Sequence, residues 1–278
     1  GAAQQRVRAA IDQGLPTYAN GRLGDLPRGA FAGLRANRQD LETTDVFAEL
    51  EHRLDGGGLV RLSARDIDRT AFYRSARANS ALAADGSFTM ETVDGDFHVR
   101  TRNYDAFLAT PVQVAGRTHK LLVGASHNEG KSWDGNYAYG PSLPFNLLQP
   151  HYDLAYPDIR LPGFTSIVTR RENALYGQAQ IGLTDTVKLL AGGRLSWAEV
   201  VTRSTSTGAV TASADPGRQF VPSLALMWDF HPQYTGYASY AETFVVQSQL
   251  NAAKQLLAPR TGKQVELGVK GEFLHKRL

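Results

Sequence analysis

The chain has 278 residues, of which 42% are hydrophobic and 27 are glycine, which is enough for one large domain or two small ones. Thirty Lys and Arg against 27 Asp and Glu give a net charge of +3, too small to indicate a nucleic-acid groove. The absence of cysteine excludes disulfide scaffolds, zinc ribbons and thiol nucleophiles, and no apolar run reaches the roughly 18 to 20 residues of a membrane-spanning helix. The first residues lack the apolar core of a secretion signal, which leaves open a cytosolic chain, a mature chain and an internal piece of a longer protein.

Residues 1–40 are predicted to form an extended loop segment with a short helix near its start. Val7 and Ile11 have helical spacing within residues 2–12, which favours the helix. Gly and Pro are frequent over residues 14–33, and these residue types end a helix and favour an extended loop.

From residue 41 onward the sequence alternates between β-rich pairs with tight turns and long polar connections. The turns are Asp55-Gly56-Gly57, Ala115-Gly116, Thr184-Asp185 and His231-Pro232-Gln233. The predicted strands are 41–54 with 58–73, 95–113 with 117–130, 170–183 with 186–202, 218–230 with 234–247, and a ninth strand at 263–274. Short turns on one side and long loops on the other are typical of an antiparallel meander in a transmembrane β-barrel.

The face pattern favours the same fold. In the last strand Val265, Leu267 and Val269 alternate with Glu266 and Lys270, as expected when one face meets lipid and the other a wet lumen. Strands of about 13 residues exceed the roughly 5 to 6 of soluble sheets but suit a tilted crossing of ~30 Å of hydrocarbon. Aromatics near the short turns fit an interfacial girdle: Trp228, Phe230, Tyr234 and Phe273. A soluble antiparallel β-sandwich would show the same alternation and remains the alternative.

Catalytic patterns find no support. Residues 125–132 loosely match a phosphate-binding loop, but Gly135, Gly140 and Pro141 forbid the helix that should follow. The seven histidines lack metal-binding spacing, and no Gly-x-Ser-x-Gly elbow is present. We therefore predict no catalytic residues, no resident metal and no cofactor.

The connections carry the best binding chemistry. The predicted ligand residues are Arg74 and Arg77 in the loop after residue 73, and Trp133, Tyr137, Tyr139, Tyr152 and Tyr156 in the loop of residues 131–165. Aromatic faces and arginines suit a bulky, partly anionic or metal-chelating small molecule. The alternative is that these aromatics only pack the loop or anchor it at a membrane surface.

Specific stretches resemble the barrel of TonB-dependent ferric-siderophore receptors. They are YGQAQIGLTDTVKLLAGGR at 176–194, YASYAETF at 237–244 and GKQVELGVKGEF at 262–273. LPTYANG at 15–21 with LPR at 26–28 is similar to the hydroxamate and pyoverdine branch, including coprogen-type receptors.

The resemblance implies an all-β segment in the outer membrane of a Gram-negative cell that captures a ferric siderophore and is coupled to the TonB complex through a plug domain. Residues 41–278 are then a partial outer-membrane barrel, about nine strands of a larger 22-stranded one, and the plug and the last strands are expected outside this chain. The implied partners are the ferric siderophore, the TonB complex and outer-membrane lipid, with no nucleic acid. A small complete outer-membrane barrel, as an adhesin or an enzyme, and a soluble β-sandwich binding module remain the alternatives.

Overall fold

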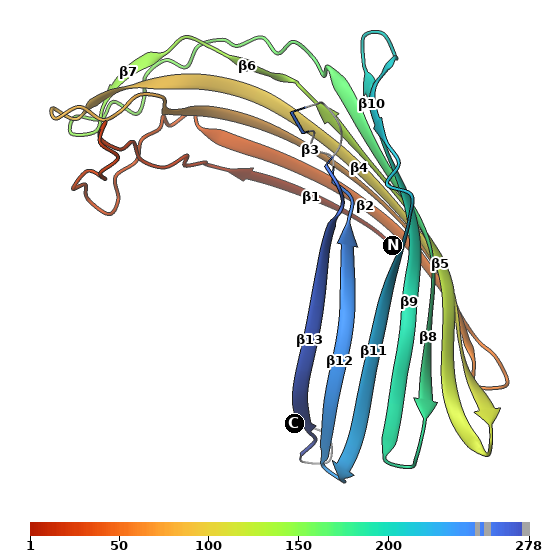
Figure 1. The fold of residues 1–278 in the computed structure, drawn as a ribbon. Coiled ribbons are helices and arrows are strands. Elements are labelled where there is room, and N and C mark those ends of the chain that lie inside the picture. Colours follow the sequence, from red (N-terminus) through yellow and green to blue (C-terminus); the bar gives the residue numbers. More distant parts are fainter. Residues whose placement is uncertain (248–250, 253–256, 274–278) are drawn as a thin grey trace.

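The computed structural model describes residues 1–247, 251–252 and 257–273, and within them the chain is all β with no helix (Figure 1). Accordingly, this part of the chain offers no helix that is long and apolar enough to span a membrane. The strands are β1 (Ala2–Ala9), β2 (Arg38–Arg53), β3 (Leu59–Ala78), β4 (Ser87–Val114), β5 (Arg117–Asp134), β6 (Tyr137–Tyr139), β7 (Leu143–Asn146), β8 (Ser166–Gly182), β9 (Val187–Ser204), β10 (Val210–Ala214), β11 (Arg218–His231), β12 (Tyr234–Val245) and β13 (Arg260–Gly271).

All strands join one curved antiparallel sheet whose main path is β1-β2-β3-β4-β5-β8-β9-β11-β12-β13. The short strands lie off this path, since β6 and β7 pair with β4 and β10 pairs with β9. Figure 1 shows the four tight turns along the lower rim of the sheet and the long connections above. The predicted antiparallel meander is confirmed, and in the described residues no ladder joins β1 to β13, so the sheet is open. The ninth predicted strand corresponds to β13, and its last predicted residue, 274, lies outside the described residues.

The predicted helix over residues 2–12 is wrong, because residues 2–9 form β1. This strand pairs with β2 from Ala2 opposite Val46 to Ala9 opposite Gln39. The pairing gives each backbone group on that side a partner, whereas an isolated helix of about ten residues is marginal in water. Residues 10–37 contain no strand or helix and make only isolated bridges, as the extended-loop prediction expects.

The two faces of the sheet differ in chemistry. One face carries Val46, Leu50 and Leu62, which are 49%, 62% and 46% exposed, and we call it the outer face. The opposite face carries ion pairs such as Arg65 to Asp45 (Nε to Oδ1, 2.9 Å), and we call it the inner face. Exposed apolar side chains continue along the outer face: Leu121, Val123, Leu175, Leu224, Leu226, Val265, Leu267 and Val269. No second sheet covers them in the described residues, so the β-sandwich alternative, which needs two packed sheets, is wrong.

Three tyrosines on the inner face each lie against a glycine of the next strand. Tyr73 is opposite Gly95, Tyr176 is opposite Gly124, and Tyr237 is opposite Gly268. A Cβ added at any of these glycines would collide with the tyrosine ring. The rings therefore cover backbone that no side chain protects, as in aromatic rescue of strand glycines.

The main apolar core lies at the end of the sheet that bears the long connections. It gathers residues from the connections before β2 and before β4, from the ends of β3 and β4, and from β7 and the residue after it: Ala32, Leu34, Ala76, Leu82, Phe88, Met90, Phe145 and Leu147. Buried Asn37 extends the edge of β3, because its side chain donates to Ala76 O (2.9 Å) and accepts from Ala76 N (2.8 Å). This core fixes the connections against the ends of β3 and β4, where the candidate site lies.

Candidate ligand-binding site

Most of the seven predicted ligand residues lie in strands and not in loops. Five are in strands: Arg74 and Arg77 in β3, Trp133 in β5, and Tyr137 and Tyr139 in β6. Two lie in the connection after β7: Tyr152 and Tyr156. The predicted loop after residue 73 is therefore wrong, because β3 continues to Ala78 in register with β4.

The sheet divides these residues between its two faces. Side chains alternate along a strand, so Arg77 shares the inner face with Tyr73, and Arg74 shares the outer face with Phe72. Tyr137 is opposite Gly95 and Tyr139 is opposite Val93, so both tyrosines lie on the inner face. The structure thus brings three predicted residues together, Arg77, Tyr137 and Tyr139.

A pocket of about 350 Å³ surrounds these three residues. Its lining comes from β3, β4, the bend after β5 and β6: Tyr73, Arg77, Val93, Asp96, Phe97, Asp134, Gly135, Asn136, Tyr137 and Tyr139. The Tyr73 and Phe97 rings stack at 5.4 Å between centroids, and Tyr137 meets Tyr139 edge to face at 5.9 Å. The volume is in the range of small-molecule sites.

The local sequence explains why β5 gives way to β6 at this pocket. Gly135 has a φ of +86°, and the ladder between β5 and β4 ends just before it, at Trp133. Asn136 then fixes the bend, since its Nδ2 donates to Asp96 Oδ2 (2.9 Å) and its Oδ1 accepts from Gly163 N (2.8 Å). The interruption lets β6 place two tyrosines beside Gly95, where small size leaves room for the Tyr73 ring.

The pocket contains both signs of charge. Arg77 donates through Nε to Glu91 Oε1 (2.6 Å), and both side chains remain partly exposed. Burial raises the pKa of Asp96, the nearby charge of Asp94 raises it further, and the hydrogen bond from Asn136 opposes both effects. Arg77 is therefore a cation within reach of an anionic ligand. Asp96 is opposite Phe72, so its carboxyl, which is costly to ionise, lies on the outer face and not beside Arg77.

Arg74 and Tyr156 form a structural cluster on the outer face. Arg74 pairs with Asp94, which is 1% exposed, through Nε (3.1 Å to Oδ1) and Nη2 (2.7 Å to Oδ2). Its guanidinium lies 4.6 Å from the centroid of the Tyr156 ring. The Tyr156 hydroxyl lies 3.0 Å from Val93 O and 3.2 Å from Ser75 O, and burial raises the pKa of this phenol. These contacts tie the long connection to β3 and β4 and leave both side chains engaged within the protein.

The other two aromatics also have partners within the protein. The Tyr152 ring lies 5.8 Å from Phe31 and 6.0 Å from Phe145, at the edge of the apolar core. Trp133 stacks on His98 with 3.9 Å between centroids. For Tyr152 the alternative of loop packing describes the observed contacts, whereas Trp133 packs within the sheet against a residue of β4.

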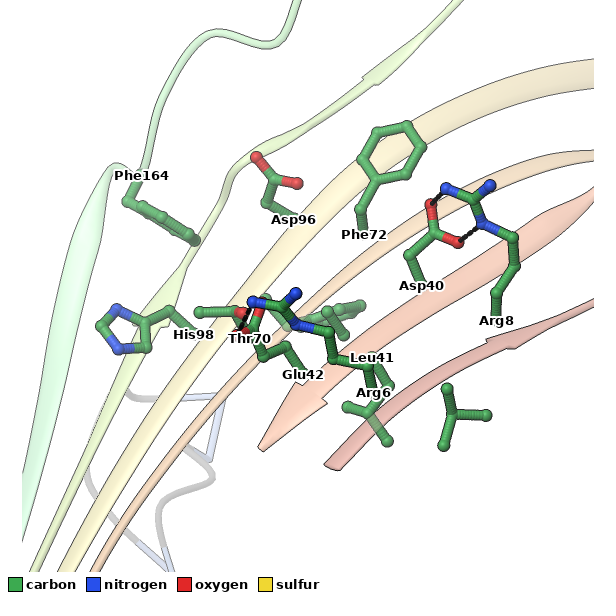
Figure 2. Close-up of a pocket in the computed structure, with 13 residues that line it drawn as sticks. Arg6, Arg8, Asp40, Leu41, Glu42, Thr70, Phe72, Asp96, His98 and Phe164 are labelled. Carbon is green, nitrogen blue, oxygen red and sulfur yellow. Dashed lines mark hydrogen bonds and ion pairs between the residues drawn. The ribbon is translucent and has the colours of Figure 1, made fainter. Parts of the chain in front are cut away.

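A larger cavity of about 740 Å³ lies beside β1 to β4, and none of the seven predicted residues lines it. Figure 2 shows its two arginine–carboxylate pairs, Arg6 with Glu42 and Arg8 with Asp40, at 3.0 Å and 2.6 Å. Phe164 and His98 lie on the side of the cavity away from Arg8 and Asp40. Because each arginine is already paired with a carboxylate, this cavity offers less free charge to a ligand than its two cations suggest.

The strand pattern gives no sign of Tyr73 and Phe97 as site residues. Tyr73 and Phe97 lie on the inner face of β3 and β4. Recognising them requires the β3–β4 register, which the connection of residues 79–86 does not fix through a tight turn. Among the described residues, no group of three or more His, Cys, Asp or Glu is arranged to hold a metal ion.

Comparison with known proteins gives the family. A family profile described as TonB dependent receptor-like, beta-barrel, matches residues 3–278. The chain is 28% identical over 276 residues to the Ferric-pyoverdine 358 receptor of Pseudomonas putida, covering 95% of this chain and 34% of the receptor. It is 29% identical over 274 residues to the Ferripyoverdine receptor of Pseudomonas aeruginosa, covering 94% and 32%. The chain therefore spans about a third of the length of these relatives.

Solved structures share the fold. The ferripyoverdine receptor of the outer membrane of Pseudomonas aeruginosa, bound to ferripyoverdine, superposes with a TM-score of 0.83 at 23% identity, over 99% of this chain and 37% of that one. The siderophore receptor PiuA from Acinetobacter baumannii gives 0.83 at 16% identity, over 99% and 45%. At such identities the likeness shows the fold alone, and it confirms the expected part of a receptor barrel. The chain therefore belongs to the TonB-dependent receptor-like β-barrel family of outer-membrane proteins, as its resemblance implied.

Proposed function

We propose that this chain is the part of an outer-membrane receptor that contacts a ferric siderophore during TonB-dependent uptake. Relatives that match 94% to 95% of this chain carry names that specify ferric pyoverdine, which supports a chelate of that class as the ligand. The family consists of transporters and receptors, so we propose that the ligand passes through unchanged, without catalysis and without a resident cofactor. The iron is cargo in this proposal. Coupling to TonB would act through a plug formed by another part of the receptor.

The observation that carries the proposal is the aromatic pocket on the inner face. Tyr73, Phe97, Tyr137 and Tyr139 surround Arg77 at the end of the sheet with the long connections. In a receptor barrel this end faces the outside of the cell, since the short turns lie on the periplasmic side. Aromatic rings stack on flat or apolar parts of a chelate, and a guanidinium binds its anionic oxygens. Of the predicted ligand residues, Arg77, Tyr137 and Tyr139 thus remain proposed ligand contacts.

Binding to the full-length receptor that contains this chain tests the proposal. Tyr137→Ala and Tyr139→Ala should each weaken ferric pyoverdine binding about tenfold, because an aromatic anchor in a pocket is worth more than about 1 kcal/mol. Arg77→Gln should do the same. Intrinsic fluorescence quenching on titration with ferric pyoverdine measures the affinity, and ferrichrome, the cargo named for an Escherichia coli relative, serves as a second chelate.

Tyr104→Ala is the matched control, since Tyr104 is 49% exposed, close to the 52% of Tyr137, but lies on the outer face. We expect it to bind like the unaltered receptor. If the pocket variants keep full affinity for both chelates, the pocket is not the contact site. If the unaltered receptor binds neither chelate, the ligand class itself is wrong.

A further inference from the structure

Two arginines of the inner face, Arg69 and Arg170, have no carboxylate partner in the described residues. Arg69 lies four residues from Tyr73 along β3, which places its side chain on the inner face. Arg170 lies six residues from Tyr176 along β8, which places its side chain on the same face. Arg69 is exposed and forms one long hydrogen bond, from Nε to Thr43 Oγ1 (3.4 Å). Arg170 is also exposed, and no side-chain hydrogen bond or ion pair joins it to another described residue.

Carboxylates neutralise the other cations in this half of the inner face, which is the half toward the long connections. The pairs are Arg65 with Asp45, Arg77 with Glu91, and Arg194 with Glu172. The remaining charged side chain here, among the described strands from β2 to β9, is that of Asp134, which accepts a hydrogen bond from Ser132. Arg69 and Arg170 against Asp134 leave one net positive charge, so this half of the face favours an anionic ligand.

The backbone between the two arginines is bare at Gly130. This glycine of β5 is opposite Arg170 on β8 and opposite Thr101 on β4. A Cβ added at Gly130 would meet no atom within 4 Å, whereas a Cβ added at Gly95 or Gly124 would collide with a tyrosine ring. A glycine inside a strand is typical of a place where a ligand approaches the backbone closely. Because no side chain covers Gly130, the space above it is open to a ligand.

The spacing of the two arginines fits a bulky ligand and not a small ion. Arg69 and Arg170 are three strands and two residues apart, which puts their Cα atoms about 16 Å from each other. Arg69 is about 13 Å from Tyr73 of the aromatic pocket along β3. The two guanidinium groups can therefore bracket one end of a ligand whose other end lies in the pocket.

We propose that Arg69 and Arg170 bind anionic groups of the chelate while its body lies over Gly130. This proposal rests on the proposed function and adds to it the contacts that select a negatively charged chelate. Each guanidinium has five N–H donors, and Arg69 uses only one of them within the protein, which leaves donors for charge-assisted hydrogen bonds to the ligand. Arg77 of the pocket is already paired with Glu91, so the two unpaired arginines supply charge that the pocket lacks.

The first test measures the affinity of the full-length receptor for ferric pyoverdine at low and high salt, about 50 mM and about 500 mM NaCl. Arg69→Gln and Arg170→Gln should each weaken binding about tenfold at low salt, because each removes charge-assisted hydrogen bonds. Their double variant should also lose most of the salt dependence of the unaltered receptor, since salt screens charged contacts. Both side chains are exposed and lack ion pairs, so the variants should keep the thermal midpoint of the unaltered receptor.

The second test fills the space over Gly130. Valine suits a strand, and its side chain has room here, so Gly130→Val should fold and should exclude the ligand from the backbone. Gly182→Val is the matched control, because Gly182 is an inner-face glycine at the other end of the sheet, where the nearest atom to an added Cβ is 3.9 Å away. Arg53→Gln is the control for charge, since Arg53 is an exposed inner-face cation beside a short turn. We expect both controls to bind like the unaltered receptor.

The pocket variants Tyr137→Ala and Tyr139→Ala separate this proposal from the proposed function. If they weaken binding while the double arginine variant keeps full affinity, the pocket binds the chelate and the proposal for Arg69 and Arg170 is overturned. An affinity of the unaltered receptor that does not change with salt also overturns it. If the unaltered receptor does not bind ferric pyoverdine, both proposals fail.

Discussion

Replacing Arg74 with methionine should release the long connection after β7 from the sheet. Arg74 is the ion-pair partner of Asp94, which is 1% exposed, and its guanidinium also lies over the Tyr156 ring. Breaking a buried pair by removing one partner costs about 3 to 5 kcal/mol, because the other charge is left uncompensated. Arg74 itself is a quarter exposed, so we expect the lower value, about 3 kcal/mol. This corresponds to about a 100-fold increase in local opening.

Native-state proteolysis of the full-length receptor measures this opening, since the cleavage rate follows the population of the open form. Chymotrypsin cleavage after Tyr152 reports on the connection, because that ring is packed against Phe31 and Phe145 when it is closed. Asp94→Asn added to Arg74→Met should restore part of the protection by removing the orphan charge. Arg77→Met, whose partner Glu91 is more exposed, is the control and should change the rate less than about fivefold. Equal rates for the two methionine variants would refute the reasoning.

Three further outcomes follow from the structure. Gly95→Val should weaken siderophore binding while the barrel still folds, because a side chain there collides with the Tyr73 ring of the pocket, and titration with ferric pyoverdine measures the loss. Asp96→Asn should have the same thermal midpoint as the unaltered receptor below about pH 4 and a higher one at neutral pH. Burial raises the folded-state pKa of Asp96, so ionising this carboxyl at a pH above its ordinary pKa of about 4 costs stability. A difference in thermal midpoint that does not depend on pH would contradict this. Asn37→Ala should lose two hydrogen bonds to Ala76, at about 1 to 3 kcal/mol for each buried group left unsatisfied, and hydrogen exchange at Ala76 N–H should speed up accordingly.

The meander was predictable because its signals are local. Ala115 and Gly116 both have positive φ, as a two-residue hairpin turn requires, and the turn fixes the β4–β5 register. Alternation then assigns the faces, so the outward position of Val265, Leu267 and Val269 follows from sequence alone.

The site was less predictable, since β3 and β4 continue past the apolar band. Beyond Ala64 the outer face of β3 carries Asp66 and Asp68, so both faces are polar and the alternation that marks a strand disappears. The sequence therefore predicts a loop at Arg74 and Arg77. The sequence does not indicate β1 for a different reason, because the conformation of this strand depends on partners 30 to 44 residues away in the sequence, Gln39 to Val46 of β2. Long-range pairing of this kind leaves no local trace.

The tyrosine–glycine pairs of the inner face constrain how this sequence can diverge. Gly124 cannot gain a side chain while Tyr176 is present, and Tyr176 cannot shrink without baring the backbone at Gly124. In each such pair, substituting either residue alone is unfavourable, whereas substituting both residues together is neutral. Among homologous barrels, the two positions of a pair should therefore co-vary and pass rarely through either intermediate.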